Sequence, residues 1–150
     1  MRFRMISLTQ IFLFFFCLSC FAAAIKQPEF GDQFYPAEKA ELSAMLDNLL
    51  EKADSKSMPG EIFMLISPHA GYGYSGQTAA IGYKLIKNRP YKTVIILGTS
   101  HHKVFNGAAV YAQGEFETSL GRLKIDDEFV KNLIGRDPDI FSDESAFSGE

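Results

Sequence analysis

The first regular pattern of apolar residues in the chain has the period of an amphipathic helix. Its apolar positions recur every three or four residues, so they share one helix face. These positions are Leu42, Met45, Leu46, Leu49 and Leu50. Pro36 precedes them and suits the first turn of a helix. Residues 25–37 are mostly polar, and we expect an extended segment there.

Two short apolar runs without polar interruption follow, at residues 62–66 and 93–97. Such a run is typical of a strand that is buried on both faces. Between them, residues 78–86 have a helical pattern that ends at Asn88-Arg89-Pro90. The order strand, turn, helix, strand predicts a βαβ unit in a parallel or mixed sheet. Its right-handed crossover would bring the two strands close together.

Further elements are predicted in the last third of the chain. Residues 108–112 and 122–125 have the composition of strands. Asp126 or Asp127 can cap a following helix, because a carboxylate accepts hydrogen bonds from the free amides of the first turn. The apolar positions of this helix are Phe129, Val130 and Leu133. The fold class predicted from these patterns is α/β.

Two acidic segments interrupt these elements. Residues 115–118 contain Glu115 and Glu117, and we predict a solvated turn there. Residues 137–150 contain several acids without the spacing of paired ligands, and we predict an exposed loop.

The N-terminus has the pattern of a secretory leader. Arg2 and Arg4 precede an uncharged apolar run at residues 11–24, which ends in three alanines. The run is shorter than the roughly 20 residues of a membrane span. We therefore expect a signal peptide at residues 1–24, cleavage after Ala24 and export to the periplasm or the extracellular space. An uncleaved anchor and a buried core helix are the alternatives.

A variant of this interpretation involves Cys20. Leu18-Ser19-Cys20 is similar to the cleavage site of bacterial lipoproteins, in which the cysteine carries the lipid. Cys17 fits that pattern poorly, because an aliphatic residue is usual there. The exported protein would then be a lipoprotein anchored through Cys20.

Composition narrows the class of protein. The chain of 150 residues is 47% apolar and 22% charged, which is ordinary for one globular domain. Removal of residues 1–24 would take away both cysteines and two arginines, so the net charge would change from −3 to −5. The domain at residues 25–150 would then hold no disulfide or thiolate ligand. Its acidic charge argues against nucleic acid as a partner.

All three histidines follow a predicted buried strand. His69 comes after the first run, and His101 and His102 come after the second. In an α/β sheet, ligands bind beyond the carboxyl ends of the strands. Neutral imidazole is the commonest metal ligand and a general base near neutral pH. The pattern favours a metal or substrate site at this rim, although a lone histidine is more often structural.

The turn after His69 resembles a dinucleotide-binding fingerprint. Residues 71–76 fit G-x-G-x-x-G between a predicted strand and helix. The fingerprint also requires an acid about 20 residues later for the ribose. No Asp or Glu occurs between Ile62 and Gly114, so we do not expect a dinucleotide. For the same reason, a carboxylate metal ligand would have to come from elsewhere in the chain.

Four motifs in order resemble those of Memo-like proteins. Residues 31–37 (GDQFYPA) resemble the family's G-x-FYPA, and residues 67–76 (SPHAGYGYSG) its PHAGY-x-YSG turn. Residues 97–102 (LGTSHH) resemble its LG-x-SHH loop, and residues 117–121 (ETSLG) its ETPLG, with Ser119 in place of proline. The prokaryotic branch of this family is known as protein B of the AmmeMemoRadiSam system.

The resemblance implies a three-layer α/β/α sandwich with a mixed sheet, related to class III extradiol dioxygenases. It implies Fe(II), or another divalent metal, held by His69 and His102. His101 would serve as the catalytic acid or base, and Tyr72 and Ser100 would line the pocket. The ligand would be a small molecule that undergoes oxygen or redox chemistry.

Two other functions stay open at this point. The same pocket could recognise a peptide or protein partner without catalysis. Family chains are also about twice as long, so we expect that this chain lacks the C-terminal half with the third metal ligand. A truncated, inactive remnant would then be the third interpretation.

Overall fold

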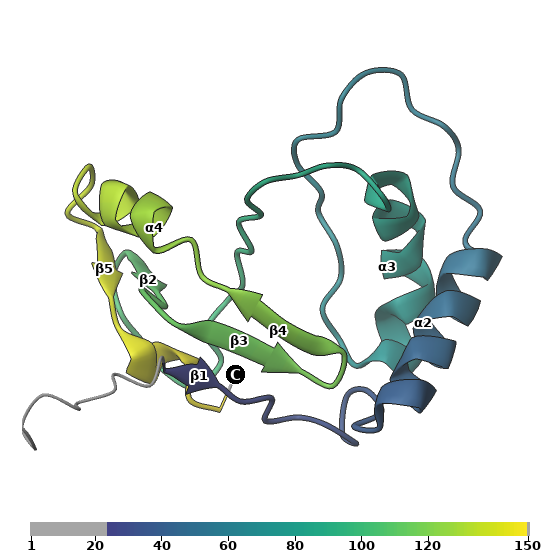
Figure 1. Cartoon of the computed structure of the whole chain (residues 1–150), viewed down its shortest axis with the longest axis horizontal. Coiled ribbons are helices and arrows are strands. Elements are labelled where there is room, and N and C mark those ends of the chain that lie inside the picture. The colour runs from purple at the N-terminus through teal and green to yellow at the C-terminus, as the bar shows by residue number, and fades with distance from the viewer. Residues whose placement is uncertain (1–23, 150) are drawn as a thin grey trace, which may run out of the picture.

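The structure is a computed structural model that describes residues 24–149. Its helices are α2 (Lys39–Lys52), α3 (Tyr72–Ile86), α4 (Asp127–Ile134) and the 3-10 helix η1 (Glu144–Phe147). Its strands are β1 (Ile25–Lys26), β2 (Ala108–Val110), β3 (Glu115–Thr118), β4 (Gly121–Lys124) and β5 (Ile140–Ser142). Helices α2 and α3 lie together on one side, and the strands with α4 lie on the other (Figure 1).

The strands form two small sheets, of which the first is mixed. In the first, β3 lies between β1 and β4, parallel to β1 and antiparallel to β4. In the second, β2 pairs with β5 in parallel, with Ala109 opposite Phe141. The predicted α/β class is therefore confirmed.

The predicted helices are present, but Pro36, expected in the first turn of the first helix, lies before α2. Glu38 caps α2, because its Oε2 accepts hydrogen bonds from the amides of Ala40 at 2.7 Å and Glu41 at 3.1 Å. Asp126, one of the two predicted caps, accepts from the Phe129 amide at 3.0 Å and begins α4. Helix α3 begins at Tyr72 instead of residue 78.

Helix α3 takes in the glycine-rich turn because its glycines allow close packing. Gly76 is buried, and a Cβ there would lie 2.9 Å from Leu49 Cδ1 of α2. At the far end of the pair, Lys84 Nζ donates to the Ala53 carbonyl at 2.8 Å. Gly76 therefore serves the contact between the two helices.

An aromatic cluster forms the core on the strand side. It consists of Tyr111, Phe116 and Phe147, whose ring centroids lie 5.1 to 6.1 Å apart in edge-to-face arrangements. Such pairs add stabilisation beyond the area they bury. Tyr111 is only 9% exposed. Ala146 of η1, which precedes Phe147 in the sequence, is also buried.

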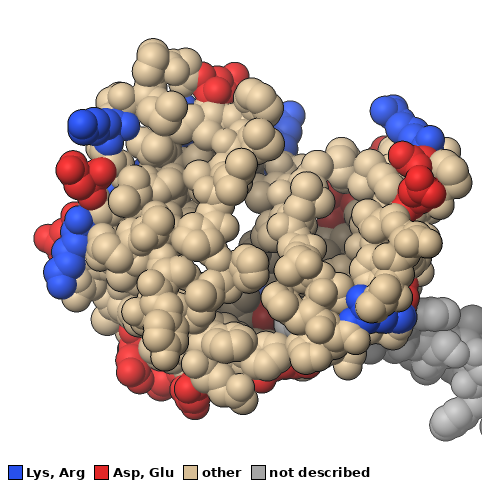
Figure 2. Space-filling view, turned by 180° about the vertical axis from the view of Figure 1, so that it is seen from behind, with Lys and Arg blue, Asp and Glu red and all other residues tan. Residues whose placement is uncertain are grey.

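The two predicted buried strands are wrong in this structure. Residues 62–66 and 93–97 are neither strand nor helix. Phe63 is 92% exposed and Ile96 is 87% exposed. An apolar run becomes a buried strand only if other strands bond to its backbone and a further layer covers it, and within residues 24–149 no strand pairs with either run. Seen from behind, charged side chains gather at the edges of the molecule and are sparse over the middle (Figure 2).

Two predicted loops instead hold regular structure. Residues 115–118, predicted as a solvated turn, are β3, and the predicted loop after residue 137 contains β5 and η1. Apolar and acidic side chains alternate along β3. Phe116 belongs to the aromatic cluster, and the glutamates pair with β4, where Arg122 Nη2 lies 3.3 Å from Glu117 Oε2. The predicted strands at 108–112 and 122–125 are confirmed as β2 and β4, with shifted ends.

The predicted leader falls outside the described residues, apart from Ala24. The same is true of Cys20 and the proposed lipid attachment. Within residues 24–149, no helix has both the length and the apolar character that crossing a membrane requires.

Candidate functional site

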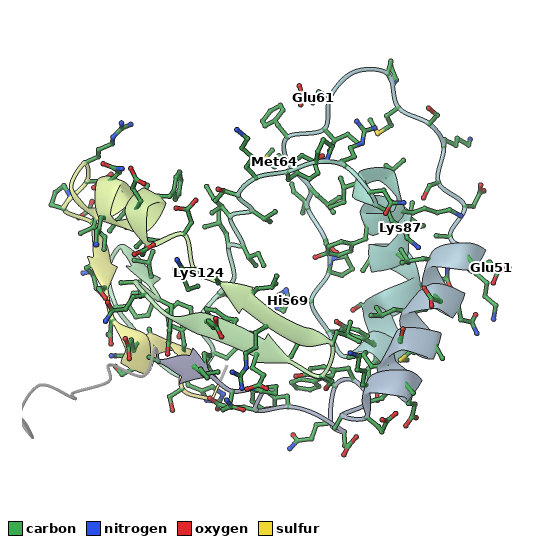
Figure 3. All side chains as sticks on the ribbon, viewed as in Figure 1. Glu51, Glu61, Met64, His69, Lys87 and Lys124 are labelled. Carbon is green, nitrogen blue, oxygen red and sulfur yellow. The ribbon has the colours of Figure 1, made fainter. Side chains whose placement is uncertain are left out.

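The two exposed apolar segments are linked by one contact near each of their ends. At their beginnings, Tyr91 Oη donates to the Ile62 carbonyl at 2.7 Å. At their far ends, the rings of His69 and His101 lie 5.6 Å apart at an angle of 55°. Figure 3 places His69 between the helix pair and the strands. His69 and His101 therefore lie close together although the strands predicted before them do not form, and the implied pairing of His69 with His102 stays a prediction.

The turn that carries His69 is fixed by the N-terminal segment. The Tyr72 amide donates to the Phe34 carbonyl at 2.7 Å, and Ser75 Oγ donates to the Ala70 carbonyl at 2.8 Å. Gly71 is the N-cap of α3, and a Cβ there would lie 3.3 Å from Cδ1 of Phe34. The close contact explains why the turn carries glycine at this position.

Tyr72 joins two of the four motifs. Its ring packs on Tyr35 with the centroids 5.6 Å apart. Burial, with Tyr35 and Tyr83 as smaller contributors, raises the pKa of Tyr72 above its usual value of 10. The phenol therefore stays protonated at neutral pH and is available as a hydrogen-bond donor. Its role as a pocket residue stays a prediction.

The loop of His101 and His102 is tied down on its C-terminal side. Ser100 Oγ accepts from the Lys103 amide at 3.1 Å, which closes a turn around the two histidines. Lys103 Nζ pairs with Asp143 at 2.5 Å and also bonds to Ser145 of η1. The bond from Lys103, followed by that from Ser145, lowers the pKa of Asp143 to about 2. Ser100 thus shapes the loop, and its predicted pocket role is untested.

His102 has different neighbours from His101. A Cβ on Gly149 would lie 3.1 Å from His102 Cδ2, so the backbone of Gly149 lies against this ring. The Gly149 amide donates to Glu29 Oε2 at 2.7 Å, and Lys26 Nζ pairs with Oε1 of the same carboxylate. The two adjacent imidazoles therefore face different parts of the chain.

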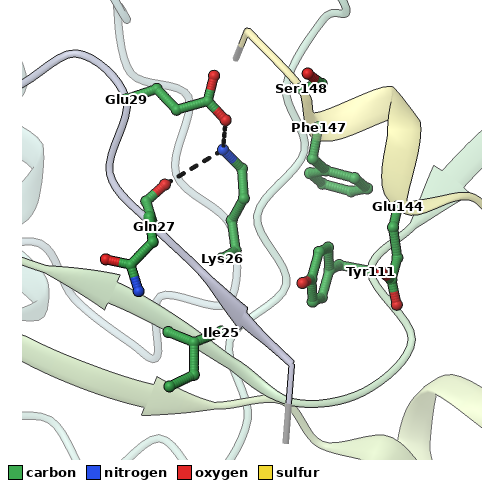
Figure 4. A pocket seen from close by; sticks show the side chains of 8 residues that line it. All are labelled: Ile25, Lys26, Gln27, Glu29, Tyr111, Glu144, Phe147 and Ser148. Atoms are coloured by element: carbon green, nitrogen blue, oxygen red, sulfur yellow. Dashed lines mark hydrogen bonds and ion pairs between the residues drawn. The ribbon is translucent and has the colours of Figure 1, made fainter.

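Glu29 lies at an open hollow of the surface, shown close up in Figure 4. Lys26 reaches Glu29 on one side, and Tyr111 and Phe147 form the other wall (Figure 4). The bond from Lys26, and next the one from the Gly149 amide, hold the pKa of Glu29 below its usual 4.5, with a smaller contribution from His102. The carboxylate is therefore ionised at neutral pH.

The spacing of the two rings can be compared with that of two imidazoles on one metal ion. Two imidazoles that bind one ion through nitrogens at roughly 2.1 Å have ring centres about 5 Å apart. The observed 5.6 Å between the His69 and His101 rings is close to this value. Within residues 24–149, no group of three or more His, Cys, Asp or Glu side chains could hold a metal ion. The described part of the chain therefore shows no complete set of three donors.

Sequence reasoning did not identify Glu29 or Asp143 as part of this site. Glu29 lies far from His102 along the chain, and no local pattern relates the two. Asp143 was among the acids of the predicted loop. Only the fold brings each carboxylate to the histidine loop.

Fold and site together define a class of protein. It is an α/β protein with a pair of histidines at the ends of two apolar segments. The model of a known family, described as Memo-like protein, matches residues 26–150. The chain belongs to the Memo-like family.

Individual relatives agree with the family model. A MEMO1 family protein of Nitrosopumilus maritimus is 37% identical over 131 residues, which cover 83% of this chain and 46% of that protein. MEMO1 family protein MHO1 of Saccharomyces cerevisiae is 39% identical over 116 residues, covering 76% and 34% respectively. The memo-1 homolog of Caenorhabditis elegans is 33% identical, covering 77% and 33%. The chain thus spans between a third and a half of these relatives' length.

Proposed function

We propose that this chain supplies the imidazole part of a divalent-metal site in a Memo-like protein, with Fe(II) as the metal. The observation that carries the proposal is the contact between the His69 and His101 rings, 5.6 Å between centroids. The resemblance implied His69 with His102. The ring contact favours His101 as the second ligand, and the variants below separate the two assignments.

Iron held by two histidines and one further ligand keeps open positions for oxygen and substrate, which suits redox chemistry on a small substrate. The chain's own residues would have supporting roles. Tyr72 would donate a hydrogen bond from its neutral hydroxyl. The histidine that does not bind metal would accept or donate a proton. The third ligand and the layers of the complete α/β/α sandwich would come from the part of the family's length that this chain does not span.

Metal titration of single variants tests this proposal. The full chain is titrated with Co(II), as a stable substitute for Fe(II), and visible absorption reports binding. His69→Ala and His101→Ala should weaken binding by more than the roughly 10-fold expected for loss of a ligand's hydrogen-bond partner. His102→Ala, in the adjacent position of the same loop, is the matched control and should bind nearly as well as the parent. Unchanged binding in a His69→Ala/His101→Ala double variant would refute the proposal.

A second candidate function is recognition of a peptide or protein partner without catalysis. Tyr74, in the first turn of α3 beyond the His69 turn, is 93% exposed. Exposed aromatic side chains are common anchors of protein interfaces. Selection of displayed peptides in the presence of a chelator would test it. Peptides that bind the parent but not Tyr74→Ala would favour this function, and no enrichment would argue against it.

We also propose that the protein is exported. The charged start, the apolar run and the three alanines support a leader at residues 1–24. Radiolabelled palmitate distinguishes a lipoprotein from a soluble exported protein. Label that is incorporated in the parent and lost in Cys20→Ser would establish the lipid anchor, and a protein recovered without residues 1–24 and without label would establish simple cleavage.

A further inference from the structure

Glu29 interacts with groups from both ends of the described chain next to the histidine loop. Its carboxylate accepts from the Gly149 amide at 2.7 Å and pairs with Lys26. Gly149 in turn packs against the His102 ring, with 3.1 Å between the position of a Cβ and Cδ2. The ionised carboxylate is also near enough to His102 for the two to interact electrostatically. Glu29 and Gly149 thus lie around one imidazole, from opposite ends of the described chain.

We propose that Glu29 is a positioning residue that holds His102 and thereby leaves His101 as the histidine that faces His69. Two adjacent histidines compete for one place opposite His69. The carboxylate and the Gly149 backbone retain His102 on its own side, so the loop presents His101. This inference rests on the proposed function, because its consequence is metal affinity.

Glu29 acts through His102 and is not itself a ligand. Within residues 24–149 it belongs to no group of three or more side chains that could hold a metal. Both of its oxygens have other partners, Lys26 on Oε1 and the Gly149 amide on Oε2. A carboxylate outside the metal's ligand set can still change metal affinity, and here it would do so by keeping His102 away from the place opposite His69.

Glu117 offers a matched control. Its side chain is 29% exposed against 37% for Glu29, and its Oε2 accepts from Gln27 of the same N-terminal segment at 2.8 Å. Its other partner is Arg122 of β4. Glu117→Gln therefore removes a comparable charge near Glu29 without removing the carboxylate beside His102.

The test is a double-mutant cycle on Co(II) affinity in the full chain. Glu29→Gln should weaken Co(II) binding about 10-fold, whereas Glu117→Gln should leave it unchanged. In a His102→Ala background, Glu29→Gln should have no further effect, because the imidazole that it positions is gone. Glu29→Asp should recover part of the affinity, and the thermal midpoint separates this effect from loss of folding.

Two results would overturn the inference. One is parental affinity in Glu29→Gln. The other is an equal loss with and without His102, which would show that Glu29 acts by another route. If the parent chain binds Co(II) and only the Glu29 predictions fail, the proposed function stands. If the parent and His69→Ala bind equally weakly, the proposed function and this inference both fail.

Discussion

Two apolar regions have opposite environments in this molecule. The aromatic cluster of Tyr111, Phe116 and Phe147 lies on the strand side with Tyr111 only 9% exposed. The segments at 62–66 and 93–97 are at least as apolar in sequence, yet Phe63 is 92% exposed. Apolar composition therefore does not decide burial by itself.

The difference lies in the backbone. Strand β3, which carries Phe116, has hydrogen-bonded neighbours on both sides, β1 and β4. The exposed segments are fixed mainly by side chains at their ends, as in the bond of Tyr91 to Ile62 and that of Thr93 Oγ1 to Asp126 at 2.7 Å. A buried core forms where strand pairing and side-chain packing occur together.

The largest effect is expected in the aromatic cluster. Tyr111→Ala removes a ring that contacts both Phe116 and Phe147. We expect a loss of about 3 kcal/mol in the free energy of unfolding, the lower end of the range for aromatic-to-alanine changes in cores. Urea unfolding followed by circular dichroism measures it. A loss below about 0.5 kcal/mol, typical of surface positions, would show that this cluster is not the core.

A smaller but substantial effect is expected at the junction of β1 and β3. Gly114 has φ +101°, and a Cβ there would lie 2.0 Å from the Ala24 carbonyl oxygen. Gly114→Ala should therefore cost about 2 kcal/mol, within the range for strained backbone positions. Gly98→Ala is the control, because a Cβ there meets nothing within 4 Å. Equal stability of the two variants would contradict the described pairing.

The tether of the histidine loop should weaken in acid. The folded-state pKa of Asp143, about 2, lies below its ordinary 3.8. The stabilisation from its bond to Lys103 is therefore present above about pH 4 and is lost as the pH falls toward 2. Chemical shifts of Lys103 and Ser145 followed by NMR should change in this interval. In Asp143→Asn the same chemical shifts should not change between about pH 4 and pH 2. A titration midpoint near pH 4 for Asp143 in the parent would refute its bond to Lys103.

The smallest effect is expected in the exposed segments. Ile96 is 87% exposed, so Ile96→Ala should change the free energy of unfolding by less than about 0.5 kcal/mol. The urea experiment used for Tyr111→Ala measures it under the same conditions. A loss comparable to that of Tyr111→Ala would mean that the segment at 93–97 is buried in solution, which would remove the contrast between the two regions.

The sequence predicted the elements whose signals are local. Helices α2 and α4 follow from apolar spacing and capping side chains, which act within a few residues. Strand pairing joins distant residues. The composition of residues 62–66 and 93–97 therefore could not show whether other strands pair with them. Strand β3 was missed for the same reason, because its glutamates are matched by Arg122 on the neighbouring strand.

The candidate site shows the same division. The apolar runs predict histidines that meet at the rim of a sheet, and His69 and His101 do lie close together, but without that sheet. The contacts of Glu29 with Gly149, and of Lys103 with Asp143, depend on how the ends of the chain come together. No local pattern contains that information.

The most direct test of the account is the NMR spectrum of the Co(II)-loaded full chain. Protons of imidazoles that bind Co(II) shift strongly, because the ion is paramagnetic. The account predicts two shifted imidazole N–H signals, one lost in His69→Ala and the other lost in His101→Ala, with both retained in His102→Ala. Shifted signals that persist in His69→Ala, or that disappear in His102→Ala and not in His101→Ala, would contradict it.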